Sequence, residues 1–283
     1  MEILMFGLTL SLMYALIASG FALILGTSRI FDLCFGSYYL VSAYLFAVLA
    51  PILGSFTALV VTIPLAGGMA WPIHRYLLYP FRETPIVVMV LSCAVAIAVG
   101  EIITLIFGTE FKYVAPLWEG SIEIVGATLS CQRLLAGGVA LIVFTLLWLY
   151  LKKTKQGLAI QALIQGTEIA GLVGINPKKI QLIVACIGGG LAALSSILVV
   201  PVFCLTPFIW FDAILLSFAG VVVGGLGSIW GALMAMGIIA FSETLVSFFI
   251  PNGGFFRQAV YVMIMIIVLL VRPYGLFGKR GEA

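Results

Sequence analysis

Apolar runs long enough to cross a membrane follow one another along almost the whole chain. We place these runs at about 5–27, 37–53, 56–73, 86–107, 134–151, 182–203, 211–225, 229–249 and 256–271. Only 9% of the 283 residues are charged, against about 25% in a typical soluble domain, and the mean hydropathy is +1.26. A soluble fold of this length could not bury so much apolar surface, so we expect an integral membrane protein.

The expected fold is all-α and polytopic, with about eight or nine transmembrane helices, some of them broken or re-entrant. A helical span needs roughly 20 apolar residues, and backbone N–H and C=O groups must pair internally in lipid. The runs lack the alternation of a β-barrel. No linker marks a second domain, so residues 1–283 are expected to form one transmembrane domain. The five cysteines are isolated and form no C-x-x-C pair, which argues against a metal site.

The lysines and arginines predict how the chain is oriented, because cytoplasmic loops are rich in both. Five lysines place the polar loop at about 152–181 in the cytoplasm, and the basic residues after Val271 place the C-terminus on the same side. The segment 108–130 carries Glu110, Glu119 and Glu123 against one lysine. It is expected outside, as a surface-lying loop and not a span. The N-terminus lies outside if every early run crosses the membrane, and on the cytoplasmic side if one run is re-entrant.

Aromatic residues near the run ends are interpreted as interfacial anchors, a usual position for tyrosine and tryptophan in membrane helices. This group includes Tyr38, Tyr39 and Tyr44. The only histidine, His74, is interpreted in the same way, and Asp212 is expected at the outer surface.

The one long polar interruption, residues 152–180, is predicted to contain a helix of about four turns. This helix would begin at Gln156 or Gly157 and run to Val173. Gly174 suits the position after the helix, where a positive φ is needed, and the Asn-Pro pair that follows stops it. Its small and apolar side chains would let a partner's backbone approach closely. The alternative is an ordinary amphipathic helix lying at the membrane interface.

Glycines at the end of the seventh apolar run break the helix there. A weaker break of the same kind precedes the second apolar run. Gly224, Gly225 and Gly227 lower helix stability, and Ser228 suits the N-cap of the helix that follows. Paired interrupted helices in two halves indicate a midplane site in transporters built from repeats, and their positive ends would attract a carboxylate. The alternative is that the glycines only permit close packing.

The first-half counterpart of this break is the segment from Ser28 to Asp32. Gly36 and Ser37 open the apolar run, with Ser37 expected as an N-cap. Arg29 and Asp32 are three residues apart, so they either form an ion pair at a helix end or contact a gate or a partner chain.

Two carboxylates lie inside or at the edge of apolar runs, Glu101 and Glu243. Carboxylates at membrane depth are usually functional. Each could line a solute path or pair with a sister subunit, or else be exposed at the interface.

The polar loop also carries a motif. Glu168, Ala170 and Gly174 have the E-x-A-x-x-x-G spacing, which resembles the cytoplasmic "EAA" loop of ABC importer membrane subunits. Other stretches, in order, resemble one subfamily, the branched-chain amino acid ABC importer permeases. They are Ala15–Gly20, Pro80–Arg82 with Thr84–Pro85, Gln165–Asn176, Gly188–Leu194, Val223–Ser228 with Gly231–Ala232, and Val271–Gly278. The chain departs from the family at residues 32–36, where Asp-Leu-Cys-Phe-Gly replaces the usual Asn-Phe-Ala-His-Gly.

The resemblance implies a type II-like permease subunit that forms half of a pore and works by alternating access, with no enzymatic activity. The implied contacts to an ATPase come from Gln161, Gln165, Glu168, Ala170, Gly171, Gly174, Ile175 and Asn176. The residues implied or interpreted as lining the path are Asp32, Gly36, Ser37, Gly224, Gly225, Gly227, Ser228 and Glu243.

The implied partners are a sister permease, two peripheral P-loop ATPases and a periplasmic or extracellular solute-binding protein, in the cell inner membrane. ATP and Mg²⁺ would bind those ATPases, because this chain has no P-loop motif and is expected to bind no cofactor itself. The solute would be a branched-chain or other small amphipathic amino acid. The basic residues lie at membrane edges, so no nucleic-acid partner is expected.

A second interpretation is a stand-alone ion- or proton-coupled secondary transporter or channel for a small amphipathic solute. Glu101 and Glu243 would then form the ion or proton site. Uptake by the single chain without ATP would favour this interpretation.

Overall fold

The computed structural model describes residues 2–118, 120–124, 127–250 and 253–278. The helices in these ranges are α1 (Glu2–Ser28), α2 (Cys34–Leu53), α3 (Ser55–Pro72), α4 (Pro85–Phe107), α5 (Cys131–Lys153), α6 (Lys155–Gln165), α7 (Thr167–Leu172), α8 (Pro177–Phe203), α9 (Ile209–Gly224), α10 (Ile229–Phe249) and α11 (Arg257–Val271). Eight helical segments in the described part are long and apolar enough to span a membrane, and α9 is a shorter apolar helix. The expected all-α polytopic fold is confirmed.

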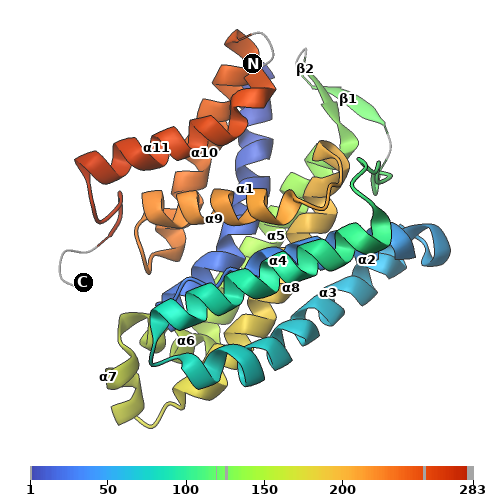
Figure 1. Ribbon diagram of the computed structural model, residues 1–283. Coiled ribbons are helices and arrows are strands. Elements are labelled where there is room, and N and C mark those ends of the chain that lie inside the picture. Colours follow the sequence, from blue (N-terminus) through green and yellow to red (C-terminus); the bar gives the residue numbers. More distant parts are fainter. Residues whose placement is uncertain (1, 119, 125–126, 251–252, 279–283) are drawn as a thin grey trace.

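Helix α1 forms the centre of the bundle (Figure 1). It packs against α5, α8, α9 and α10, and its residues from Met13 to Thr27 are buried without interruption. Small residues permit the close approaches, as in other membrane helix pairs. A Cβ at Gly20, for example, would lie 3.1 Å from the carbonyl oxygen of Gly188 in α8.

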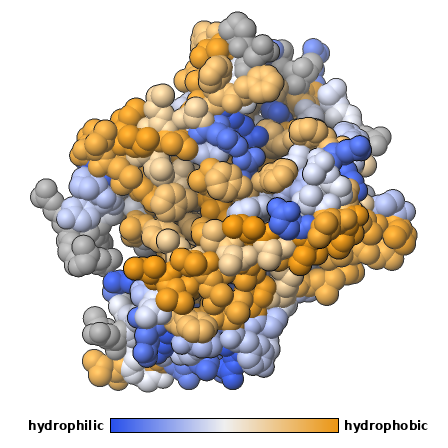
Figure 2. Space-filling view, in the orientation of Figure 1, coloured by the Kyte–Doolittle hydropathy of each residue, from blue (hydrophilic) through white to orange (hydrophobic). Residues whose placement is uncertain are grey.

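The two ends of the bundle differ in what they carry. One end, which we call the α6–α7 end, holds α6 and α7 (Figure 1). Phe277 and Gly278, in the segment after α11, line a cavity with α6 at this end. The opposite end, the hairpin end, holds the start of α1 and the strands β1 (Ser121–Ile124) and β2 (Ala127–Ser130). Hydrophilic side chains gather at the α6–α7 end, whereas much of the middle is apolar (Figure 2).

The segment 108–130 does not cross the bundle, as expected, but part of it forms a hairpin and not only a loop. Strands β1 and β2 pair antiparallel, with Ser121 opposite Ser130. Lys112 makes a further bridge to Leu205, after α8, through reciprocal backbone hydrogen bonds of 2.9 and 3.0 Å. Glu119, which supported the expectation of an outside loop, lies outside the described residues.

Short irregular helices complete the chain. A π-helical segment, Ile73–Leu78, and a 3₁₀ turn, Tyr79–Phe81, extend α3 towards α4, and the 3₁₀ turn Gly253–Phe256 precedes α11. Proline has no N–H to donate, and Pro72 stands directly before the π-helical segment.

Two sequence-based interpretations are wrong. Tyr38, Tyr39 and Tyr44 are buried in the bundle and are not interfacial anchors, because α2 turns this face towards its neighbours. Ser37 does not cap a helix, because α2 already begins at Cys34. Its hydroxyl is fully buried and has no hydrogen-bond partner among the described residues.

Candidate functional site

The predicted four-turn helix of the polar loop is present as two helices, so the prediction of one continuous helix is wrong. The chain breaks at Gly166, whose extended backbone (φ 173°, ψ 120°) ends α6 and precedes α7. Gly174 has the expected positive φ of 83°. Asn176 then caps the next helix, since its side-chain oxygen accepts from the backbone N–H of Lys179 at 3.3 Å.

Helix α6 is fixed firmly to the end of α5. The Thr154 hydroxyl accepts a hydrogen bond from the backbone N–H of Gly157 at 2.9 Å, which is N-capping. The Gln161 side-chain amide donates to the carbonyl oxygen of Leu151 at 2.9 Å. At Gly157 any Cβ would overlap the carbonyl oxygen of Tyr150, so this crossing requires glycine.

Helix α7 presents an apolar tip on this fixed base. Ala170 is buried and packs α7 against the rest of the chain. Its carbonyl oxygen accepts a hydrogen bond from the backbone N–H of Ile175 at 3.1 Å. Leu172 and Val173 are 89% and 78% exposed. Gly171 has open space around it, and the side chain of Glu168 lies outside the described part. The segment is therefore a protruding surface with two bare aliphatic side chains.

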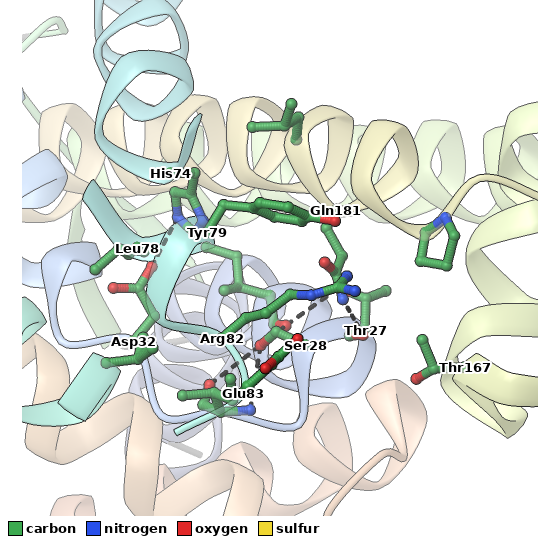
Figure 3. Close-up of a pocket in the computed structure, with 15 residues that line it drawn as sticks. Thr27, Ser28, Asp32, His74, Leu78, Tyr79, Arg82, Glu83, Thr167 and Gln181 are labelled. Atoms are coloured by element: carbon green, nitrogen blue, oxygen red, sulfur yellow. Dashed lines mark hydrogen bonds and ion pairs between the residues drawn. The ribbon is translucent and has the colours of Figure 1, made fainter. Parts of the chain in front are cut away.

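A cavity of about 380 Å³ lies directly behind this segment (Figure 3). Thr167, at the start of α7, lines it together with residues from the end of α1 and the starts of α4 and α8. Its polar lining comprises Thr27, Ser28, Asp32, His74, Tyr79, Arg82, Glu83, Thr167 and Gln181. Gln181 joins α8 to α1 by donating to the carbonyl oxygen of Thr27 at 3.2 Å.

Asp32 and His74 form a pair in this cavity, with 2.8 Å between Oδ2 and Nε2 (Figure 3). The expected Arg29–Asp32 ion pair is absent from the pairs that the described residues form, and His74 is not an interfacial anchor. Asp32 is only 3% exposed, and its other oxygen accepts from the backbone N–H of Cys34 at 2.9 Å. Asp32 thus connects the start of α2 to the π-helical segment after α3.

The glycines after α9 serve close packing. The backbone N–H groups of Leu276 and Phe277 donate to the carbonyl oxygens of Val223 and Gly224 at 2.8 and 3.1 Å. A Cβ at Gly225 would lie 2.5 Å from the nitrogen of Gly278. The segment after α11 is therefore bonded to the end of α9, and this favours the close-packing alternative for these residues.

Ser228 caps α10 as predicted, accepting from the backbone N–H of Gly231 at 3.0 Å. The capped end lies beside α6, because a second cavity brings Gly227 and Ser228 together with Gln161 and Gln165. The first break lines the cavity that Thr167 of α7 also lines, so both breaks lie at the α6–α7 end. The first break separates two candidate spans, α1 and α2, and the second separates the short helix α9 from α10. The pairing of two helix ends at the midplane stays a prediction. Gly36 lies inside α2, where a Cβ would be 2.5 Å from Ile214 of α9.

Glu243 lies in the half of the bundle towards the hairpin end and finds partners within its own chain. The Tyr14 hydroxyl donates to the carboxylate, 2.9 and 2.7 Å from its two oxygens. Arg257 Nε lies 3.1 Å from Oε1, and its guanidinium stacks 3.9 Å above the ring of Phe203. Glu101 has no such network and is exposed on α4.

Sequence reasoning missed three residues of these clusters: His74, Tyr14 and Arg257. A cation at the edge of an apolar run, as at Arg257, signals a partner for a nearby buried carboxylate. Tyr14 gave no signal, because an aromatic residue in the middle of a span is commonplace.

Comparisons with known proteins agree with this arrangement. The family described as "Branched-chain amino acid transport system / permease component" matches residues 3–271. The permease protein LivH of the high-affinity branched-chain amino acid transport system, from Escherichia coli K12 and from Salmonella typhimurium, is 25% identical, covering 96% of this chain and 94% of the relative. A probable LivH from Methanocaldococcus jannaschii is 28% identical over 93% of this chain and 88% of the relative.

A solved structure shares the fold. The chain superposes on one chain of "PsaBC from Streptococcus pneumoniae in complex with Fab" with a TM-score of 0.55 at 12% identity, covering 97% of this chain and 93% of that chain.

Proposed function

Because the chain belongs to the branched-chain amino acid transport permease family and is a permease subunit of an ABC importer, we propose that it forms half of a pore for branched-chain or related small amino acids. It is a multi-pass membrane protein and a transport component. A similar or identical second permease supplies the other half of the pore. A solute-binding protein delivers the solute from outside the cell.

The observation that carries this proposal is the α6–α7 segment. Its base is fixed by the cap at Thr154 and the bond from Gln161, while Leu172 and Val173 protrude without partners of their own chain. A rigid base with an apolar tip suits a helix that docks in a groove of a peripheral subunit. We assign that subunit as one of two ATPases that hold the ATP and Mg²⁺.

The orientation follows from this assignment. The α6–α7 end carries the lysines of the polar loop together with Arg75 and Arg82, as the positive-inside rule requires of a cytoplasmic face. The protein then lies in the cell inner membrane with the hairpin end facing outwards. The solute-binding protein docks at that end.

The cavity behind α7 is the part of the bundle that a movement of the docked α6–α7 segment would change first. Thr167 shares it with Asp32 and His74, so a displacement of α7 reaches the joint between α2 and α3 directly. Alternating access would use this joint and the Gly224–Ser228 break as its inner end, with Glu243 further along the path. We expect Glu243→Gln to lower uptake while the complex still assembles.

The test is affinity purification of the chain from its native membrane in mild detergent, with each co-purifying protein identified. We expect a second permease and P-loop ATPases. The double variant Leu172→Asp/Val173→Asp should lose the ATPases at least tenfold, whereas Leu158→Asp, a change at an exposed leucine of α6, should retain them. Recovery of the chain alone, or ATP-independent uptake by it, would contradict the proposal and favour a secondary transporter.

A further inference from the structure

Helix α4 carries a carboxylate on the outside of the bundle. Glu101 lies in the most hydrophobic of the candidate spans, on the face opposite the buried residues Ser92, Ala96 and Gly100. No ion pair or hydrogen bond reaches Glu101 from the described residues. Six residues separate it from Phe107 at the end of α4, so at 1.5 Å per residue it lies about 9 Å inside the helix end.

Neighbouring helices add further polar groups on the exterior. Asp212, near the start of α9, accepts a hydrogen bond from the side-chain amide of Gln258 at the start of α11; Asp212 is half-buried and Gln258 is exposed. Helix α9 meets α4 immediately beside Glu101, because a Cβ at Gly100 would lie 2.9 Å from Trp210 Nε1. Figure 2 shows hydrophilic patches over this region of α4, α9 and the start of α11, set in an otherwise apolar surface.

We call this surface, formed by Glu101, Asp212 and Gln258 on α4, α9 and α11, the α4–α9–α11 face. Helices α11 and α4 are the two least buried of the candidate spans in the described part of the chain. Exposed aliphatic side chains surround the polar ones, for example Ile97 and Leu105. Within the part of the chain that the structure describes, the face is therefore unpartnered and mixed in polarity.

Lipid is an unfavourable neighbour for this face. A charged side chain at membrane depth costs about 2.5–3.5 kcal/mol by insertion scales, and the short glutamate side chain cannot reach the headgroups as lysine or arginine can. The contrast with Glu243 is instructive, because that carboxylate turns inwards and meets Arg257 and Tyr14. Glu101 instead is exposed, and none of the ion pairs among the described residues includes it.

We propose that the α4–α9–α11 face faces a second membrane subunit of the same fold across a water-filled path, with Glu101 and Asp212 as polar groups of that path. This inference rests on the proposed function, since it identifies which surface pairs with the sister permease. The aliphatic residues of α4 and α11 contact the partner and close the path against lipid. The two carboxylates give the path acidic character, which suits the ammonium group of an amino acid.

The test is the accessibility of single cysteines in the assembled complex, in a background from which the five native cysteines are removed. Glu101→Cys should react with a membrane-impermeant charged thiol reagent at least tenfold faster than Leu141→Cys. Leu141 is a matched control, because it is exposed on α5 in an apolar setting. Both cysteines should react equally after denaturation. In the same background, Leu105→Cys should form an oxidative cross-link to the second membrane subunit in a partner cysteine scan.

The outcomes separate this inference from the proposed function. If no second membrane subunit co-purifies, the proposed function fails. If one co-purifies but Glu101→Cys reacts no faster than Leu141→Cys and cross-links form only through α5, the inference fails while the function stands. Glu101→Leu gives a check that needs no labelling: unchanged uptake with raised thermal stability would mean that the face meets lipid, and lost uptake with an intact complex supports the path.

Discussion

The Glu243–Arg257 pair offers a prediction whose size follows from burial. Replacing Arg257 with glutamine leaves the Glu243 carboxylate, only 5% exposed, with the Tyr14 hydroxyl as its remaining partner. Removing one member of a buried ion pair costs about 3–5 kcal/mol, because the other charge stays buried and uncompensated. We therefore expect Arg257→Gln to lower the free energy of unfolding by about that amount.

The reverse replacement should cost less. Glu243→Gln keeps an oxygen that accepts from Tyr14, and the Arg257 side chain remains 27% exposed and stacked on Phe203. A guanidinium with some access to water and an aromatic partner is not left uncompensated, so the expected loss is about 1.5–3 kcal/mol, the size of one hydrogen bond to a charged group.

Thermal unfolding of the purified protein in detergent, at one fixed scan rate, measures both losses. With about 2 °C of Tm per kcal/mol for a large domain, Arg257→Gln should lower Tm by roughly 6–10 °C and Glu243→Gln by roughly 3–6 °C. The double variant should lose less than the sum, since neither charge is then left alone. Equal Tm losses in the two single variants would refute the argument that Glu243 is more deeply buried than Arg257. A loss in the double variant equal to the sum of the single losses would refute the ion pair.

Three further predictions concern the α6–α7 end. Gly225→Ala should abolish uptake and lower Tm by several degrees, because the added Cβ would overlap the segment after α11 and the φ of Gly225 is 105°. The control, Gly237→Ala, adds a Cβ in open space and should behave as the parent protein. Equal Tm values for the two variants would contradict the packing of Gly225 against the segment after α11. Asp32→Asn should lower ATP-driven uptake and should be matched by His74→Ala, since each removes the same contact; uptake assays in membrane vesicles test this, and a defect in only one variant would count against a shared role. Gly157→Ala should weaken ATPase co-purification while membrane insertion persists, because the α5–α6 crossing must open; undiminished co-purification would show that the α6 base does not set the docking geometry.

Most of the fold could be predicted from the sequence, because membrane helices are defined by long apolar runs. The runs placed at about 86–107 and 229–249 match α4 and α10, and each predicted end lies within one residue of the observed end. The positive φ of Gly174 and the cap at Ser228 also followed from local chemistry, since turn and cap preferences depend on a few adjacent residues.

The rest depended on contacts between distant segments. Asp32 pairs with His74, 42 positions further along the chain, and not with the nearby Arg29, which only the packing of α3 beside α2 determines. The burial of Tyr38 and Tyr39 has the same origin, since α2 is enclosed by neighbours at the depth where tyrosine is usually interfacial. The break at Gly166 needed the geometry of α6 on α5, which no local pattern encodes.

The central position of α1 has a consequence for how the protein is made. Helix α1 is synthesised long before the helix it packs against most extensively, because α10 begins at Ile229, 201 residues after Ser28. At about 5–20 residues per second, the ribosome needs roughly 10–40 s to supply that neighbour. During this time the face of α1 that carries Gly7 and Tyr14, which contact Phe241 and Glu243 of α10, must rest against lipid or against a membrane chaperone. Nascent chains that stop before α10 should therefore be recognised as unfinished and degraded, even though each of their spans has already been inserted.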